Sequence, residues 1–135
     1  MSFLPMTSHD ELDHAWNTLR DELVPYIGER AASLFAYAIA DAGDSALTDV
    51  FRKVLVDSGE NVDDPQVTEA EQLLMDWGRL IAKAPAAIPD EMYDRLEASF
   101  NPKLRLILVA FAAQTIASAV FTTVGRVPLE EQVSP

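Results

Sequence analysis

Hydrophobic residues recur every three or four positions along most of this chain, which is the spacing of one face of an α-helix. A first helix is predicted from the apolar stripe that runs from Leu12 to Leu23. Ser8 and Glu11 have the spacing of a capping box, in which each side chain satisfies a free backbone N–H at the helix start. Pro25 is expected to limit the end of this helix.

The next segment, residues 27–42, is apolar on nearly every side and is therefore predicted to be a buried helix. Asp44 or Ser45 is expected to cap a third helix through its side-chain oxygen. Gly59 is expected to end that helix, because glycine adopts the left-handed backbone conformation without steric cost.

Three further helix starts are visible in the second half of the chain. Thr68 and Glu71 form a second capping box, and a short helix is expected after Pro89. Asn101 and Pro102 have the cap-then-proline order that is typical of a helix start. Since no segment alternates with a period of two, we predict an all-α fold, a single bundle of about six helices.

The last helix is unusually apolar, with nineteen residues free of charge from Leu106 to Val124. That length would suffice for a membrane span, but polar residues interrupt it and no aromatic belt flanks it. We therefore expect no membrane partner and a helix buried in the core or between subunits, which favours a homo-oligomer formed through the C-terminal helices. The side expected to let another helix approach closely carries Ala110, Ala113, Gln114, Ala117 and Ser118.

Length, charge and cysteine content narrow the functional classes. The 135 residues fit one domain, here 1–135, with a core at about 8–125 and an acidic tail at 126–135. A net charge of −12 would repel phosphates, so no nucleic-acid partner is expected. There is no cysteine, which excludes disulfides and thiol catalysis, and no basic, signal-like N-terminus, so a cytoplasmic location is expected.

The segment 42–59, AGDSALTDVFRKVLVDSG, resembles the core helix of the AhpD-like family of alkylhydroperoxidases and carboxymuconolactone decarboxylases. In that family a glycine precedes Cys-x-x-Cys-x-x-x-His, and a second glycine closes the helix. Placing Gly43 and Gly59 on the two glycines puts Asp44 and Leu47 at the cysteines and Phe51 at the histidine. The stretch VTEAEQLLMDWGRLIAKAPAAIPDEMYDRL and the VPLEE ending resemble the decarboxylase branch, so that the resemblance spans residues 25–131.

The resemblance implies a helical scaffold whose reactive groups have been lost. By the family's spacing its proton-relay glutamate falls on Ala32, so the four motif positions Ala32, Asp44, Leu47 and Phe51 carry neither thiol nor imidazole. Peroxide reduction requires a thiolate and a resolving thiol, so thiol peroxidase activity is not expected. The decarboxylase chemistry of the family depends on the histidine that Phe51 replaces.

Two readings of the vacated motif remain open. Leu47 and Phe51 are interpreted as core residues that fill the space of the redox side chains. Asp44 is either an exposed helix cap or, if it faces a pocket, an acid or base that acts with Tyr37 or Arg52 on a small organic acid. Pocket-lining candidates are Phe35, Tyr37 and Trp77, each of which is also a candidate core residue.

No cofactor or metal site is expected. His9 and His14 are five residues apart and so do not share a helix face, and the acidic loop 57–68 lacks the glycine and final glutamate of a calcium loop. The sequence thus favours a non-redox module that binds a small apolar or organic-acid ligand or a protein partner. The alternatives are a cofactor-free enzyme that uses Asp44 and a purely structural partner with a large exposed apolar patch.

Overall fold

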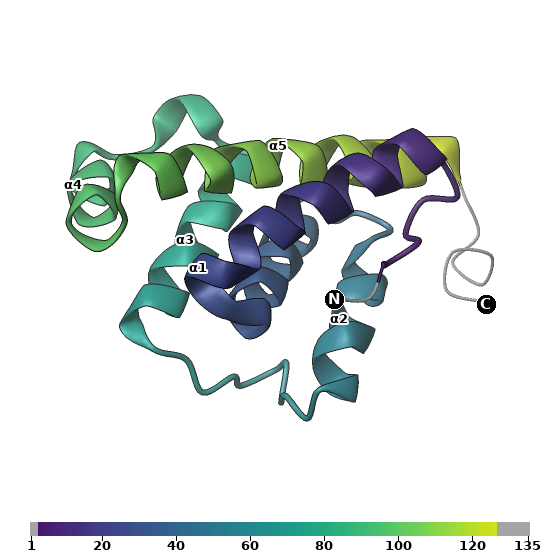
Figure 1. Ribbon diagram of the computed structural model, residues 1–135, viewed down its shortest axis with the longest axis horizontal. Coiled ribbons are helices and arrows are strands. Elements are labelled where there is room, and N and C mark those ends of the chain that lie inside the picture. Colours follow the sequence, from purple (N-terminus) through teal and green to yellow (C-terminus); the bar gives the residue numbers. More distant parts are fainter. Residues whose placement is uncertain (1–2, 127–135) are drawn as a thin grey trace.

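The computed structural model describes residues 3–126, and every regular element in this range is helical, as the sequence predicts. The predicted tail at 126–135, which includes the VPLEE ending, lies outside the described residues from position 127 onward. The elements, shown in Figure 1, are α1 (Asp10–Ala42), α2 (Thr48–Asp57), α3 (Glu69–Lys83), the short 3₁₀ helix η1 (Pro85–Ala87), α4 (Asp90–Ser99) and α5 (Pro102–Gly125).

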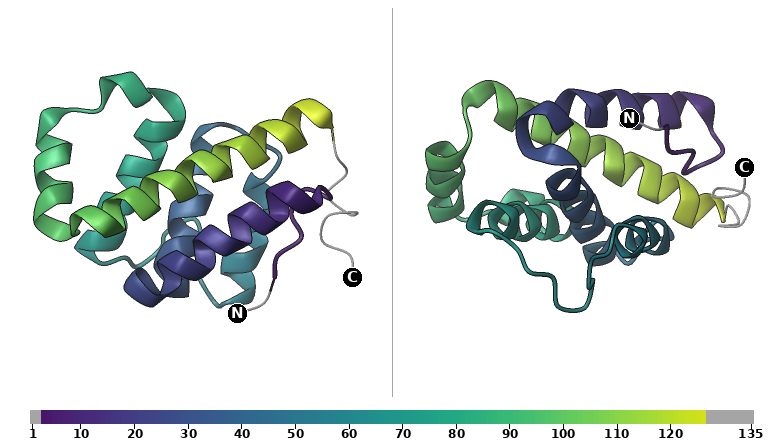
Figure 2. Two further views of the ribbon diagram at one scale, coloured as in Figure 1. Left: turned by 45° about the horizontal axis from the view of Figure 1, so that its top comes forward. Right: turned by 60° about the horizontal axis from the view of Figure 1, so that its bottom comes forward.

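Helix α1 is the central element, because α2, α3 and α5 all pack against it. Its first half runs alongside α5, and its second half turns away to lie between α2 and α3, as the views of Figure 2 show. Helix α4 packs on α3 at the end of the molecule where α5 begins (Figure 1). One long face of α5 is thereby left without a covering helix among the described residues.

The two predicted N-terminal helices are present as two helical segments of α1 joined by a sharp kink, but the break lies at Gly28 and not at Pro25. The chain stays helical through Pro25 and bends at Gly28, which has φ 89° and ψ 161°. Proline removes one backbone donor but its fixed φ suits a helix, whereas a positive φ strains every residue except glycine. The bend therefore falls three residues later, at the residue that adopts it most easily.

The predicted helix boundaries of the second half are confirmed. The side chain of Thr68 accepts a hydrogen bond from the Glu71 backbone N–H at 3.1 Å, and Glu71 accepts one from the Thr68 N–H at 2.8 Å. Asn101 Oδ1 accepts from the Leu104 N–H at 2.8 Å and caps α5. Gly59 has φ 91° and follows Ser58, the residue that caps the end of α2, as a left-handed stop requires.

Two predicted caps are wrong. Helix α1 begins after His9, whose Nδ1 accepts from the Leu12 N–H at 3.4 Å, while Ser8 adopts a left-handed φ of 63° and does not cap. Helix α2 begins after Leu47 and has no side-chain cap, so neither Asp44 nor Ser45 has that role. A bend precedes α1 and a turn precedes α2, and Ser8 and Asp44 lie in these segments and not at the cap positions.

Five aromatic rings form a continuous series through the core and join four helices. Trp77 of α3 stacks on Phe35 at 5.9 Å between centroids, and Phe35 stacks on Phe111 of α5 at 6.1 Å. The series continues from Phe111 to Trp16 at 5.2 Å and from Trp16 to Phe51 of α2 at 5.6 Å. Such ring pairs contribute roughly 0.5–1.5 kcal/mol each beyond their buried area.

The segment before α1 is fixed by two buried polar side chains that the hydrophobic pattern does not identify. The Asp13 carboxylate accepts from the Thr7 N–H at 3.0 Å and from the Thr7 hydroxyl at 2.7 Å. The Asn17 amide accepts from the Leu4 N–H at 2.8 Å and donates to the Leu4 carbonyl at 2.9 Å. Because these groups satisfy one another, Met6 is held fully buried against the core.

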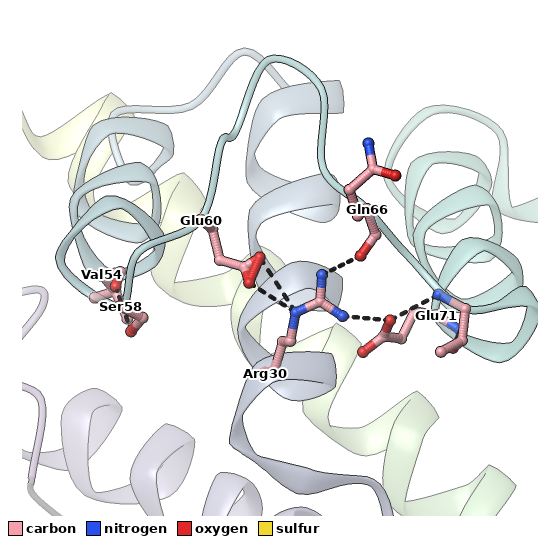
Figure 3. Close-up of polar contacts among 7 residues, drawn as sticks. Arg30, Val54, Ser58, Glu60, Gln66 and Glu71 are labelled. Carbon is pink, nitrogen blue, oxygen red and sulfur yellow. Dashed lines mark hydrogen bonds and ion pairs between the residues drawn. The ribbon is translucent and has the colours of Figure 1, made fainter.

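Arg30 connects the second half of α1 to the loop between α2 and α3 (Figure 3). Its Nε donates to Glu60 Oε1 at 2.8 Å, its Nη1 donates to Glu71 Oε1 at 2.6 Å, and its Nη2 donates to the Gln66 carbonyl. The hydrogen bond from Arg30 lowers the pKa of Glu60 below its usual value. One guanidinium thus joins three segments that are distant in sequence.

Replacing Arg30 should remove part of the pH dependence of stability. A carboxyl whose pKa is lowered on folding stabilises the protein above its unfolded pKa of about 4.3, and this contribution is lost as the pH falls through the folded value. We expect Arg30→Gln to be less stable than wild type at pH 7 and the difference to shrink below about pH 4. Urea unfolding followed by circular dichroism at several pH values measures this.

Arg79→Gln is the matched control, because Arg79 is exposed on α3 and, within residues 3–126, pairs with Asp76 three positions earlier, at 3.1 Å. Exposed pairs of this kind contribute about 0–1 kcal/mol. A difference between wild type and Arg30→Gln that stays constant from pH 7 down to pH 3 would contradict the assigned role of the Arg30–Glu60 pair.

Candidate functional site

Three of the four positions that the resemblance assigns to reactive residues are filled by core side chains. Ala32, Leu47 and Phe51 are at most 2% exposed and belong to one hydrophobic cluster, so Leu47 and Phe51 are core residues as predicted. Phe51, at the position that the resemblance assigns to a histidine, stacks on Trp16. None of the three cavities described below is lined by these residues. The site implied by the resemblance is thus packed with apolar atoms.

Asp44 does not face this cluster. It is exposed and lies in the turn between α1 and α2, with a left-handed φ of 49°, and its backbone N–H donates to the Asp41 carbonyl at 3.1 Å. The buried position that acid–base chemistry at Asp44 would need is not present. Tyr37 and Arg52, the residues predicted to act with Asp44, contact each other instead. Arg52 donates hydrogen bonds to the Tyr37 hydroxyl at 3.5 Å and to Asp63 at 3.0 Å.

The three predicted pocket-lining residues do not form one pocket. Phe35 is fully buried in the aromatic series, and Tyr37 is half-buried beside Arg52. Trp77 is 4% exposed and stacks on Phe35, but it also lines a groove on the far side of α3. Only Trp77 therefore remains a candidate for ligand contact.

The uncovered face of α5 carries an apolar stripe with no charged residue. Six exposed residues recur at intervals of four, three, four, three and four positions, so they form one line along the helix. Leu106, Val120 and Val124 are 72%, 54% and 76% exposed. We call this line the α5 stripe: Leu106, Ala110, Ala113, Ala117, Val120 and Val124.

The opposite face of α5 packs against α1 and contains the three buried polar residues of the helix, Thr115, Ser118 and Thr122. Ser118 is fully buried and Gln114 is half-buried, so the prediction that both share a face with the exposed alanines is wrong. Thr115 and Thr122 tolerate burial because their hydroxyls donate to carbonyls of the preceding turn, those of Phe111 and Ser118, at 2.8 and 3.1 Å.

Two apolar grooves adjoin the stripe, one near each end. The first, of about 330 Å³, lies between α3, α4 and the start of α5, and Leu106 and Val109 form part of its wall. The second, of about 220 Å³, lies at the end of α5 and is bordered by Val120 and Val124. A third cavity, of about 460 Å³, is more polar and lies beside Arg30.

Among the described residues, no three His, Asp or Glu side chains are placed to hold a metal ion. One described helix, α5, is long and apolar enough to cross a membrane, with 39% of its most hydrophobic window buried in the fold. The core helices of soluble proteins meet the same criteria of length and composition.

No protein-family model, curated protein or solved structure matches this chain. The resemblance to the AhpD-like family therefore stays a prediction.

Proposed function

We propose that this protein is a non-redox, self-associating helical domain whose α5 stripe pairs with the α5 stripe of a second copy. The observation that carries the proposal is the exposed, charge-free line from Leu106 to Val124. Monomeric soluble proteins seldom expose a continuous apolar surface of this kind unless it is an interaction site. The function of the domain would thus be to form a dimer. Its scaffold resembles the AhpD-like family, but core side chains fill three of the four positions that correspond to the reactive residues.

The stripe is suited to a second copy because its positions are symmetric about Thr115. In an antiparallel pair related by a twofold axis, each residue faces its symmetric counterpart: Leu106 faces Val124, Ala110 faces Val120, and Ala113 faces Ala117. Small residues at the centre allow the two helix axes to approach to about 8 Å, the short end of the usual range. Branched side chains near both ends would then cover the alanines.

The charge distribution favours a symmetric apolar contact over a polar one. The chain has 22 acidic and 10 basic residues, so two copies repel each other over most of their surface. Along Leu106–Val124 there is no charge, and contact there brings together only apolar and small polar side chains. Burial of the exposed Leu and Val side chains supplies the association free energy, about 25 cal/mol per Å² of apolar surface.

The alternative of a cofactor-free enzyme has less support. Asp44 is exposed, and its suggested helpers Tyr37 and Arg52 contact each other. The membrane alternative has less support as well, because one side of α5 packs along α1 within the fold, whereas a single spanning helix is surrounded by lipid.

Sedimentation equilibrium over a wide concentration range tests the proposal. We expect a monomer–dimer equilibrium in aqueous buffer with a dissociation constant on the order of 1 μM, about 8 kcal/mol of association free energy. In parallel, the protein is mixed with neutral phosphatidylcholine vesicles and floated on a density gradient, and it should remain in the soluble fraction. A protein that stays monomeric at about 100-fold higher concentration, or that floats with the vesicles, would reject the proposal.

A further inference from the structure

The groove between α3, α4 and the start of α5 is open to solvent and large enough to hold a small molecule. Its volume of about 330 Å³ lies within the range of ligand pockets. Its walls are formed mainly by the rings of Trp77 and Tyr93 and by the side chains of Leu106 and Val109. Such walls suit an apolar chain or ring.

Two buried N–H donors on the residues that line this groove have no hydrogen-bond partner among the described residues. One is Nε1 of Trp77, a residue that is 4% exposed, and the other is Nε of Arg105. Buried donors are nearly always satisfied in folded proteins, since an unmade hydrogen bond costs the group its hydration. The other indole of the chain follows this rule, because Trp16 Nε1 donates to Thr115 Oγ1 at 2.9 Å.

The charge at the groove indicates the kind of group that would satisfy these donors. Arg105 is the one charged residue of the lining, although the protein as a whole carries a net charge of −12. Its Nη1 lies 3.7 Å from Glu97 Oε1, a long contact to a carboxylate whose side chain is 64% exposed. A guanidinium presents its N–H groups in the geometry that a carboxylate accepts. The N-terminal end of α5 adds a partial positive charge nearby.

We propose that this groove binds a small amphipathic monocarboxylate, an apolar chain or ring that ends in one carboxyl group. The apolar body lies between Trp77, Tyr93 and Val109, and the carboxylate pairs with the guanidinium of Arg105. Trp77 Nε1 and Arg105 Nε are closed to solvent in this structure, so they donate to the carboxylate after the side chains around them shift on binding. All residues of the lining belong to one chain. Leu106 is also the first residue of the α5 stripe, so the groove borders the proposed contact between two copies, and binding is tested on dimeric and monomeric protein.

The two tryptophans make a direct test available, because a ¹⁵N-labelled sample gives two indole N–H signals. Trp77→Phe assigns its signal by removing it. On addition of octanoate we expect the Trp77 signal to move downfield and saturate, while the Trp16 signal stays in place. A probe of ten non-hydrogen atoms is expected to bind with a dissociation constant on the order of 1 mM, so the titration runs to about 10 mM.

Octanol is the control ligand, because it has the same chain and no charge, and we expect it to bind at least tenfold more weakly. Arg105→Met keeps an unbranched apolar side chain and should weaken octanoate binding at least tenfold. Arg79→Met makes the same change on an exposed part of α3 and should leave binding unchanged. An unmoved Trp77 signal, equal binding of octanol, or full binding by Arg105→Met would overturn the proposal. The same titration on monomeric Ala113→Glu protein separates ligand binding from assembly.

Discussion

Ala113→Glu is expected to convert the protein from a dimer to a monomer. Ala113 is exposed near the middle of the α5 stripe, where the proposed pair places it opposite Ala117 of the second copy. The substitution would place two carboxylates, one from each copy, in the closest part of the contact with no cation to pair them. Burying an unpaired charge costs several kcal/mol, so we expect the dissociation constant to rise at least 100-fold, about 2.7 kcal/mol or more. Sedimentation velocity at several concentrations measures the change.

Ala70→Glu is the matched control for this prediction. Ala70 is an exposed alanine in the first turn of α3, at the end of that helix farther from α5 (Figure 1), and the substitution adds the same charge. A carboxylate in a first turn is compatible with the helix dipole, so the fold should tolerate it. We expect this variant to remain a dimer. If the two variants associate equally well, the α5 stripe is not the contact surface.

Among alanine substitutions at the motif positions, Phe51→Ala is expected to cause the largest loss of stability. The ring is 2% exposed and stacks on Trp16, so its removal leaves a cavity in the middle of the aromatic series. Phenylalanine-to-alanine changes in cores cost about 3–5 kcal/mol. For a chain of this length that corresponds to a fall in melting temperature on the order of 10–20 °C. Thermal and urea unfolding followed by circular dichroism measure it.

Val56→Ala provides the comparison within the same helix, because Val56 is 52% exposed and should change stability by no more than about 0.5 kcal/mol. Phe51→His, which introduces the histidine that the resemblance places at this position, should also destabilise the protein, since a buried imidazole would lack hydrogen-bond partners. If Phe51→Ala cost less than about 1 kcal/mol, the motif region would be loosely packed and the proposed loss of the family's site would be wrong.

Most of the helices could be predicted because their signals are local. A capping box such as Thr68–Glu71 involves residues three apart, and Asn101 caps α5 at the same separation. The sequence predicts a break at Pro25 because proline lacks a backbone N–H, whereas the position of the kink at Gly28 depends on where α1 meets α3 and α5. Such tertiary contacts are not encoded in any short window of sequence.

The groups that fix distant segments could not be predicted. Arg30 joins Glu60 and Glu71, which are 30 and 41 residues away, and nothing in the spacing of charges along the chain indicates these partners. Asp13 lies in a helix where a polar residue is expected to face solvent, but the segment around Thr7 covers it. Long-range polar contacts of this kind become visible only when the fold is known.

The candidate interaction surface was predicted in part. The absence of charge from Leu106 to Val124 indicates that α5 has more apolar surface than one small domain can cover. Because this helix is apolar on both sides, its sequence does not determine which side packs against α1. The structure resolves this by burying Ser118 and exposing Val120. The unpartnered donors of Trp77 and Arg105 have no sequence signal, since they depend on the packing of α3 against α4 and α5.

The central claim is that two copies pair through α5 in antiparallel orientation, and disulfide cross-linking tests it most directly. The chain has no cysteine, so Leu106→Cys and Val124→Cys each introduce a single thiol at one end of the stripe. The two variants are mixed under reducing conditions, allowed to exchange subunits and then oxidised. Because a disulfide needs Cα atoms within about 7 Å of each other, the claim predicts mainly mixed disulfides between the two variants. Predominant disulfides between identical variants, or no more cross-linking than an Ala70→Cys control gives, would contradict it.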